Sequence, residues 1–214
     1  IKGNGNLYWN RGMHLAWKTA SNKNDYDFYL WLNDDVKILS NGIKTLLENH
    51  KLEPNSLLCG VMSSEFDKKI TYGGSKLQKG LLEPNISKPL LCQSINGNLV
   101  LIPKNIFKKV GNLDSVFSHA IGDFDYGLRV VKCGFDCRIT TKVVGYCEQD
   151  KSVVEWCNPK VKFFDRLKSL YSPLGNSHPF YFFIYEKRHL GILTAFKHLI
   201  TIHIRLIYPQ LWKT

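Results

Sequence analysis

The sequence contains no Cys-x-x-C pair, and its six cysteines follow no regular spacing. Cys133 and Cys137 straddle Gly134, a predicted helix end, and they lack the usual spacing of zinc ligands, so a zinc site is disfavoured. The pattern indicates reduced thiols in a reducing compartment. No signal peptide is present, and the opening residues from Ile1 to Gly5 do not resemble a natural start, so we expect further chain upstream.

The composition excludes a disordered chain, because 44% of the 214 residues are hydrophobic and 13% are aromatic. A chain of this length and content can bury a core as one domain, or as one domain with an appendage. No internal repeat or low-complexity segment is apparent.

Acidic residues are scarce near the carboxyl end of a chain whose net charge is +11. Residues 1–159 hold 20 Lys and Arg against 16 Asp and Glu, whereas residues 160–214 hold 9 against 2. The positive charge is therefore concentrated in the tail, and we expect no nucleic-acid partner. We predict a catalytic domain over 1–159 and a helical, basic tail over 160–214.

The tail contains no uninterrupted apolar run of about 20 residues, which a membrane-spanning helix needs. Its segment from Leu190 to Tyr208 instead predicts an amphipathic helix. One face holds Leu193, Phe196, Ile200, Ile204 and Ile207, and another holds Thr194, Lys197, His198, Thr201 and Arg205. Such a helix either lies on an anionic membrane surface or packs on its own domain with a basic outer face. Both interpretations remain open.

Two adjacent carboxylates, Asp34 and Asp35, follow an aromatic and aliphatic run over residues 26–32. The run predicts a buried strand, and polar residues at the carboxyl end of a strand in an open α/β sheet are placed for ligand binding. Because side chains alternate along a strand, Asn33 and Asp35 should point one way and Asp34 the other if the extended geometry continues to these residues. The alternative is an ordinary turn, which these residue types also favour.

The remaining patterns predict alternating helices and strands, and hence an α/β protein. Helices are expected over 7–20, 41–49 and 104–110, with strands over 56–62 and 99–103. Ile43, Leu46 and Leu47 are expected to form the apolar patch of the second helix. Residues 63–95, rich in Gly, Pro, Ser and Lys, predict short strands and loops.

A second acidic cluster lies at residues 122–129, where Asp123 is expected in or near the first turn of a helix. Phe124, Leu128 and Val131 share one face of that helix. Free backbone amides and the helix dipole favour a charged Asp123, and a simple N-cap is the alternative role. Asp125 has the i, i+4 spacing of an ion pair with Arg129.

Four stretches, taken together, carry a family resemblance. They are Gly5-Asn-Leu-Tyr-Trp-Asn-Arg-Gly-Met13 with Ala16, Tyr26-Asp-Phe-Tyr-Leu-Trp-Leu-Asn-Asp-Asp-Val36, Asn96-Gly-Asn-Leu-Val-Leu-Ile-Pro103 with Val110-Gly-Asn-Leu-Asp114, and Gly122-Asp-Phe-Asp-Tyr-Gly-Leu-Arg129. In this order and at these distances they resemble the inverting family 2 glycosyltransferases of the GT-A fold, and within them bacterial rhamnosyltransferase-like members. The resemblance implies a nucleotide-sugar-binding sheet flanked by helices.

The resemblance also implies roles for individual residues. Asn33-Asp34-Asp35 stands where the family has its DxD-type motif, with Asp35 as the metal ligand and Asn33 and Asp34 on the donor. Asp123 matches the family's catalytic aspartate. Gly5 and Met13, in the first matching stretch, are assigned to donor binding. Asn98 and Asp125, in the later stretches, and His119, four residues before Asp123, are candidates for the acceptor site. A satisfied loop histidine is the alternative for His119, and a structural role is the alternative for Asp125.

The sequence departs from the family pattern at three places. The first strand-helix-strand-helix section of the family is missing, so we expect on the order of 60 residues upstream. Gly122 occupies the place where the family has a glutamate, which removes a supporting carboxylate. Residues 146–150 contain no histidine to serve as a further metal ligand, and Glu148 or solvent would have to substitute.

The implied reaction is metal-dependent transfer of a hexosyl or rhamnosyl group, with inversion, from a UDP- or dTDP-sugar to a glycan or lipid-linked acceptor. Mn²⁺ or Mg²⁺ would neutralise the charge on the diphosphate leaving group. The implied setting is bacterial surface polysaccharide assembly, at the cytoplasmic face of the membrane. The alternatives are a non-catalytic membrane-bound binding module and a metal-dependent nuclease.

Overall fold

The structure, a computed structural model, forms two compact units. It describes residues 1–76, 80–149, 154–175 and 177–211. The sheet unit comprises residues 13–113 and 123–150, and the helical unit comprises residues 1–12, 114–122 and 151–214. The predicted division at 159/160 stays a prediction. Each unit is described by itself below.

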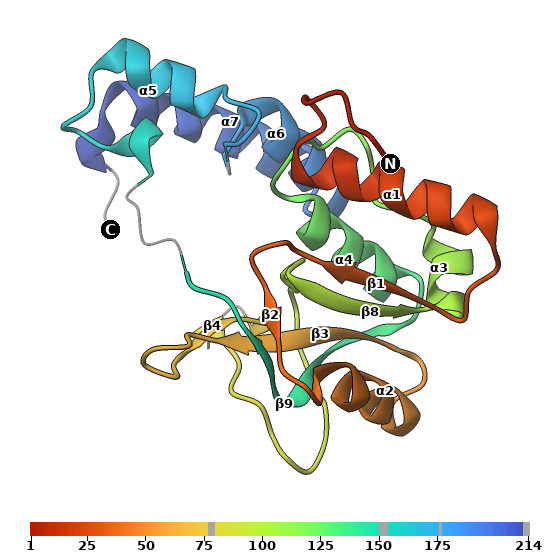
Figure 1. Ribbon diagram of the computed structural model, residues 1–214. Coiled ribbons are helices and arrows are strands. Elements are labelled where there is room, and N and C mark those ends of the chain that lie inside the picture. The colour runs from red at the N-terminus through yellow and green to blue at the C-terminus, as the bar shows by residue number, and fades with distance from the viewer. Residues whose placement is uncertain (77–79, 150–153, 176, 212–214) are drawn as a thin grey trace. The chain divides into compact units, whose positions relative to one another are not determined.

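The sheet unit is built on a seven-stranded mixed sheet with the order β1-β8-β3-β9-β2, to which β4 adds beside β3 and β7 beside β9 (Figure 1). Its strands are β1 (Phe28–Leu32), β2 (Lys37–Ile38), β3 (Ser56–Ser63), β4 (Ile70–Tyr72), β7 (Leu90–Leu91), β8 (Leu99–Pro103) and β9 (Asp136–Tyr146). Strands β3 and β9 run parallel, and the other recorded pairs in this sheet are antiparallel. A separate two-stranded sheet joins β5 (Ser75–Lys76) to β6 (Gly80–Leu81).

Strand burial follows position in the sheet. Every residue of β3 is buried, because β3 is an interior strand and helices cover both faces of the sheet. β1 lies at the end of the strand order, and it buries Tyr29 and Trp31 while Leu30 and Leu32 are exposed. The prediction of a strand here is confirmed. The prediction that it is buried is wrong for one of its faces.

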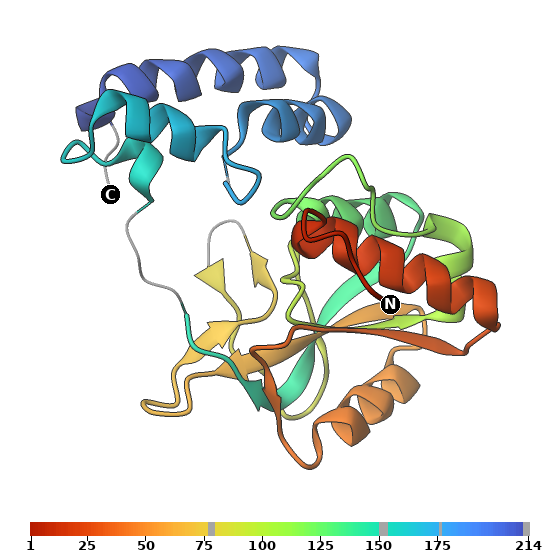
Figure 2. The same ribbon diagram turned by 45° about the horizontal axis from the view of Figure 1, so that its top comes forward.

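Helices cover both faces of the sheet, with α1, α3 and α4 on one side and α2 on the other (Figures 1 and 2). Their bounds are α1 (Tyr8–Lys23), α2 (Gly42–Leu52), α3 (Lys104–Val110) and α4 (Gly122–Lys132). α1 begins in the helical unit and continues into the sheet unit. This arrangement confirms the predicted α/β class and is consistent with a GT-A-type sheet.

An aromatic cluster joins the first helical layer to the sheet. The ring of Trp17 in α1 lies 5.6 Å from Tyr29 and 5.5 Å from Trp31, both in β1. It also lies 5.0 Å from Phe107 of α3 and 5.4 Å from Tyr126 of α4. These centroid distances are typical of packed aromatic pairs. The cluster therefore fixes α1 and α4 against the edge strand β1.

Two predicted apolar faces are only partly buried. In α2, Leu46 packs in the core, but Ile43 and Leu47 are exposed because Gly42, Thr45 and Asn49 complete the inward face. In α4, Phe124 and Val131 are exposed. The helix turns Tyr126 and Val130 inward instead. In both helices the inward face is rotated from the one that the apolar pattern predicts.

The helical unit contains η1 (Glu155–Cys157), α5 (Phe163–Leu170), α6 (Pro179–His189), α7 (Ile192–Ile207) and η2 (Pro209–Leu211). Its small core consists of Trp156, Cys157, Leu170, Ile202 and Leu206. The buried Arg166 donates from Nε and Nη2 to the carbonyl of Leu206, which ties α5 to the end of α7. Within the described ranges, no helix is long and apolar enough to cross a membrane.

Candidate active site at the ends of β1, β8 and β9

Asn33 extends the pairing between β1 and β8 by one residue. Leu32 of β1 faces Leu99 of β8 in the antiparallel register. Asn33, which follows β1, therefore faces Asn98, which precedes β8. The backbone amide of Asn33 donates to the carbonyl of Asn98 over 3.0 Å, and its side-chain Nδ2 donates to Asn98 Oδ1 over 2.9 Å. The backbone and the side chain of Asn33 are therefore both anchored to β8.

Asp34 and Asp35 form a turn directly after Asn33. The amide of Val36 donates to the carbonyl of Asn33 over 3.3 Å, and both aspartates are exposed. The turn interpretation is therefore confirmed. It does not compete with a functional role, because the turn presents two carboxylates to solvent at the end of a rigid strand.

Cys147 lies beside Asp35 at the end of β9. Its thiol donates to Asp35 Oδ2 over 3.7 Å, and Asn98 Nδ2 donates to Cys147 Sγ over 3.4 Å. Burial, followed by the nearby Asp35 carboxylate, raises the pKa of the Cys147 thiol to about 12. The thiol is therefore neutral at physiological pH. Asp35, Cys147, Asn98 and Asn33 form one connected polar group, called the strand-end group below.

Asp123 occupies the second position of α4 and is partly buried. The amide of Gly97 donates to its Oδ2 over 2.9 Å, and the amide of Phe124 donates to its Oδ1 over 2.9 Å. Burial nevertheless raises the pKa of Asp123 to about 6, against the lowering effect of these amides. We expected the helix amides to have the larger effect and to favour the charged carboxylate. Desolvation of the charged form outweighs them.

The loop before β8 connects Asp123 to the strand-end group. Gly97 binds Asp123, the next residue binds Asn33, and the amide of Asn98 donates to Asn96 Oδ1 over 3.1 Å. Residues 96–98 thus hold the two acidic motifs, which lie about 90 positions apart in the sequence, in a fixed relation. All of these contacts lie within the sheet unit.

Asp125 is fully buried, and Arg129 Nε donates to its Oδ2 over 2.9 Å. The same guanidinium donates to the carbonyls of Val110 and Asn112. The predicted pairing of Asp125 with Arg129 is confirmed, but the expectation of an ordinary surface pair is wrong because Asp125 is buried. These contacts support the structural alternative for Asp125 over a place in the acceptor site.

The absence of a side chain at Gly122 has a steric reason. A Cβ there would come within 2.5 Å of Asn10 Cγ and closer still to Asn10 Oδ1. Asn10 is held in place because its Nδ2 donates to the carbonyls of Asp114 over 2.7 Å and Phe117 over 2.8 Å. The carboxamide of Asn10 therefore occupies the space that a larger residue at position 122 would need.

The other predicted residues are more dispersed. Gly5 and His119 belong to the helical unit, where His119 Nδ1 accepts from the amide of Trp9 over 3.4 Å and burial lowers the pKa of His119. That contact supports the alternative of a satisfied loop histidine. Met13 lies in α1 at the start of the sheet unit and is partly buried. The donor roles of Gly5 and Met13 stay predictions.

The donor atoms of the strand-end group fit a metal ion that is bound mainly through a substrate. Among the described residues, no three His, Cys, Asp or Glu side chains gather closely enough to form a metal site by themselves. Glu148 Oε1 accepts from the amide of Glu65 over 2.7 Å. Mg²⁺ and similar ions are commonly held by one or two carboxylates together with substrate phosphates and water. Asp35 can supply such a carboxylate.

Sequence reasoning missed Cys147 and the role of residues 96–98. Cys147 follows β9, and β9 was not predicted, although its run of Ile139, Thr140, Thr141, Val143 and Val144 is rich in the β-branched residues typical of strands. The contacts of Gly97 are made by its backbone amide, which leaves no signal in a single sequence.

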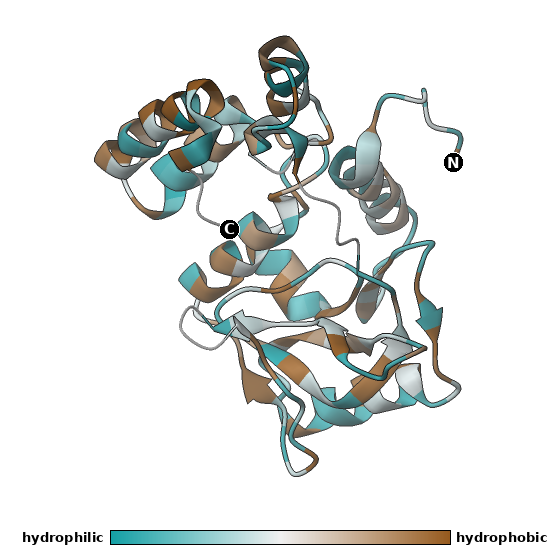
Figure 3. Cartoon of the chain, turned by 90° about the vertical axis from the view of Figure 1, so that its left-hand side faces the viewer, coloured by the Kyte–Doolittle hydropathy of each residue, from teal (hydrophilic) through white to brown (hydrophobic). Residues whose placement is uncertain are grey.

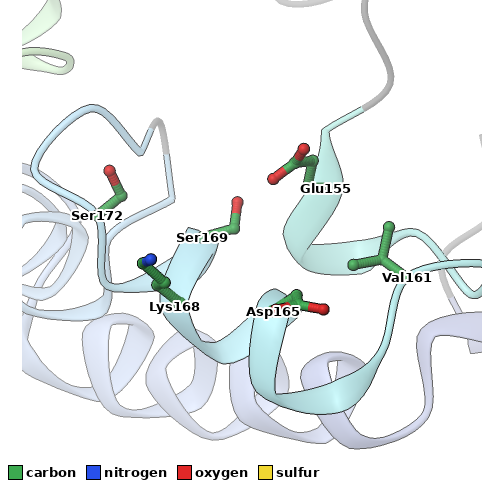
Figure 4. Close-up of a pocket in the computed structure, with 6 residues that line it drawn as sticks. All are labelled: Glu155, Val161, Asp165, Lys168, Ser169 and Ser172. Atoms are coloured by element: carbon green, nitrogen blue, oxygen red, sulfur yellow. The ribbon is translucent and has the colours of Figure 1, made fainter.

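A separate pocket of about 520 Å³ lies in the helical unit, between η1 and α5 (Figure 4). Its lining is mostly polar and consists of Glu155, Val161, Asp165, Lys168, Ser169 and Ser172. None of these residues was predicted to act in the site. All six belong to the helical unit, whereas the strand-end group belongs to the sheet unit.

The sequence matches no protein-family model and no curated protein. The structure of the chain is similar to the solved structure of GalNAc-T7 with UDP, GalNAc and Mn²⁺. The match covers 83% of this chain and 41% of that chain, with 13% sequence identity and a TM-score of 0.48. The structure is also similar to S. aureus TarS, with 10% identity and a TM-score of 0.46 over 90% of this chain and 39% of that chain. The chain thus spans about two fifths of the length of each. Function is therefore inferred from the residues of the site.

Proposed function

We propose that this chain carries the acidic centre of a metal-dependent glycosyltransferase that moves a sugar from a nucleotide-diphosphate donor to an acceptor hydroxyl with inversion. The observation that carries the proposal is the 96–98 loop, whose contacts tie Asp123 to the strand-end group. One motif offers exposed carboxylates for a donor, and the other offers a single carboxylate of raised pKa for a proton transfer.

Asp35 is the residue that would hold Mn²⁺ or Mg²⁺, and Asp34 and Asn33 would contact the donor. The bound ion would supply neutralisation of the charge that develops on the departing diphosphate. Asn98 orients Asn33 and Cys147. Cys147 in turn donates to Asp35 and so keeps that carboxylate oriented without adding a charge, because its thiol is neutral.

Asp123 would act as the general base. The acceptor oxygen forms a bond to the anomeric carbon, its proton passes to an Asp123 carboxylate oxygen, and the bond from that carbon to the diphosphate oxygen breaks. Attack opposite the leaving group inverts the configuration. With a pKa of about 6, Asp123 is largely ionised at pH 7 and is more basic than an ordinary aspartate. That match to the operating pH is what a general base needs.

The finer parts of the proposal follow the family resemblance of the sequence. They are membership of family 2, a UDP- or dTDP-linked hexose or rhamnose as the donor, and a glycan or lipid-linked acceptor in bacterial surface polysaccharide assembly. The protein would work in the cytoplasm, peripherally on the inner face of the membrane. The high positive charge of residues 160–214 supports that location.

Calorimetry with UDP and with dTDP, each with and without Mn²⁺, tests the donor side of the proposal. Wild-type protein should bind one of these nucleotides more tightly in the presence of Mn²⁺. Asp35→Ala should lose that metal-dependent gain because the carboxylate that anchors the ion is removed. Glu83→Ala, which removes an exposed carboxylate outside the site, is the matched control and should keep it. An undiminished metal response in Asp35→Ala, or no nucleotide binding by wild type, would reject the proposal.

A further inference from the structure

Helix α7 leaves its most hydrophobic face in solvent. Five large apolar side chains, spaced three or four residues apart, are exposed along it: Leu193, Phe196, Ile200, Ile204 and Ile207. At 100° per residue these positions fall within a single narrow stripe. The exposed fraction reaches 83% at Leu193 and 59% at Ile200. This set of five is called the α7 stripe.

The core of the helical unit does not use the α7 stripe. The buried residues of the helix are Ala195, Ile202 and Leu206, which lie on its opposite side. Ile202 and Leu206 belong to the core cluster with Trp156 and Leu170. This arrangement distinguishes the two interpretations of the sequence, a helix on a membrane surface and a helix packed on its own domain. α7 does pack on its own unit, but through a different face from the one that the apolar pattern marked. Figure 3 shows hydrophobic and hydrophilic bands alternating along the helices of this unit.

Aromatic side chains widen the apolar surface beside the stripe. The ring of Phe183 in α6 lies 5.1 Å from that of Phe196, at an edge-on angle of 72°. Phe180, one turn earlier in α6, is exposed. Single exposed apolar residues also occur elsewhere in the described chain, such as Phe66 and Ile86. A row of such residues along one face of a helix differs from these, because grouped apolar side chains mark interaction sites.

The charges around the stripe identify its partner as anionic. No Asp or Glu occurs in the sequence from Lys187 to the end of the chain. Two lysines of α6 and α7, Lys187 and Lys197, are exposed. Lys197 is exposed and follows Phe196 directly, at the border of the stripe. A second copy of this chain would bring like charges together at the same place. An anionic lipid surface offers hydrocarbon to the stripe and negative headgroups to the basic side chains.

We propose that the α7 stripe docks this protein on anionic bilayers, with α7 lying in the plane of the interface. The helix has 16 residues, about 24 Å of length, which suits a position along the surface. Ile200 and its neighbours enter the boundary between headgroups and acyl chains, while Lys197 stays at headgroup level. This docking does not require the proposed transferase activity, and a vesicle measurement separates the two.

Flotation of the full chain with vesicles tests the docking, using phosphatidylcholine alone and phosphatidylcholine with phosphatidylglycerol. Wild-type protein should float with the anionic vesicles at low salt and only weakly with the neutral ones. The double variant Phe196→Ser/Ile200→Ser should partition about 10- to 100-fold less, because two large side chains no longer bury apolar surface. The double variant Phe66→Ser/Ile86→Ser, which replaces exposed apolar residues of the sheet unit, is the matched control and should float like wild type.

Light scattering and circular dichroism on the same proteins complete the test. All three should share one helix content. The stripe variant loses the ring contact between Phe183 and Phe196, so it should melt slightly below wild type while remaining folded at the temperature of the flotation. No flotation of wild type with anionic vesicles, or equal flotation of the stripe variant, would overturn the proposal. A wild-type dimer that the stripe substitutions convert to a monomer, without vesicle binding, would assign the stripe to self-association and would overturn it as well.

Discussion

At the residue scale, the behaviour of Asp123 results from two opposing effects. The amides of Gly97 and Phe124 each donate to one of its oxygens, which favours the carboxylate. Burial disfavours the carboxylate more strongly, so the pKa rises to about 6. The folded protein therefore holds a charge at neutral pH that would be better solvated in the unfolded chain. An aspartate in this state is poised to accept a proton.

The raised pKa of Asp123 makes stability depend on pH. Its folded pKa lies above its unfolded value, so ionisation destabilises the fold, with a penalty that grows between about pH 4 and 6 and is complete above that range. Asparagine resembles the protonated acid. We therefore expect Asp123→Asn to raise the melting temperature relative to wild type by about 2–8 °C more at pH 7.5 than at pH 4, measured by calorimetry.

Asp27→Asn, at an exposed position of the same unit, is the control for the loss of one carboxylate. If the advantage of Asp123→Asn instead grew toward acid pH, the backbone amides rather than burial would dominate at this site.

At the element scale, the start of α4 is shaped by its neighbour Asn10. Gly122 precedes Asp123 directly, and the carboxamide of Asn10 fills the space beside the Cα of Gly122. Asn10 itself cannot easily turn away, because it satisfies the carbonyls of Asp114 and Phe117. The segment that delivers Asp123 is thus fixed by a contact that a side chain at position 122 would break.

Gly122→Ala should therefore destabilise the protein by about 1–3 kcal/mol, as overpacking of a tight site generally does. Asn10→Ala removes the obstructing atoms, so adding Gly122→Ala in that background should cost much less. Chemical denaturation of the two single variants and the double variant measures this coupling. Additive costs would show that Asn10 is not what restricts position 122.

Much of the element pattern was predictable from the sequence. The strand at 99–103 and the helix at 104–110 agree with the structure, in which the helix ends before Gly111, whose φ is 80°. These elements are short and bounded by strong local signals. β9 was missed, although it is the parallel neighbour of the central strand β3. Its pairing with residues about 80 positions away in the sequence is a non-local contact that local patterns do not reveal.

The site was predictable to the extent that its residues follow strand and helix ends. Asn33, Asp35 and Asp123 stood out because polar residues that follow a strand or begin a helix are placed for ligand binding. Asn98 was named as a candidate, but its contacts with Asn33 and Cys147 depend on tertiary packing. The raised pKa of Asp123 was not predictable, because burial is a property of the folded chain. The inward faces of α2 and α4 could not be read from apolar residues alone, since Gly42, Thr45 and Asn49 contribute to one of them.

At the scale of the whole molecule, the proposed reacting residues and most of the excess positive charge belong to different units. The strand-end group and Asp123 lie in the sheet unit, whereas the α7 stripe and most of the excess positive charge lie in the helical unit. A protein of this kind would hold its reacting groups on a rigid sheet while another surface determines where the reaction takes place.

The central claim is that Asp123 is the base of a sugar transfer, and the turnover of Asp123→Asn tests it most directly. With Mn²⁺ and the UDP- or dTDP-sugar that wild type accepts, the variant should bind the donor nearly as wild type does. Its turnover should fall by about 10²- to 10⁴-fold, because the proton acceptor is gone. Wild-type kcat/KM should decline below about pH 6, where Asp123 becomes protonated. Turnover that is unchanged in Asp123→Asn would contradict the account.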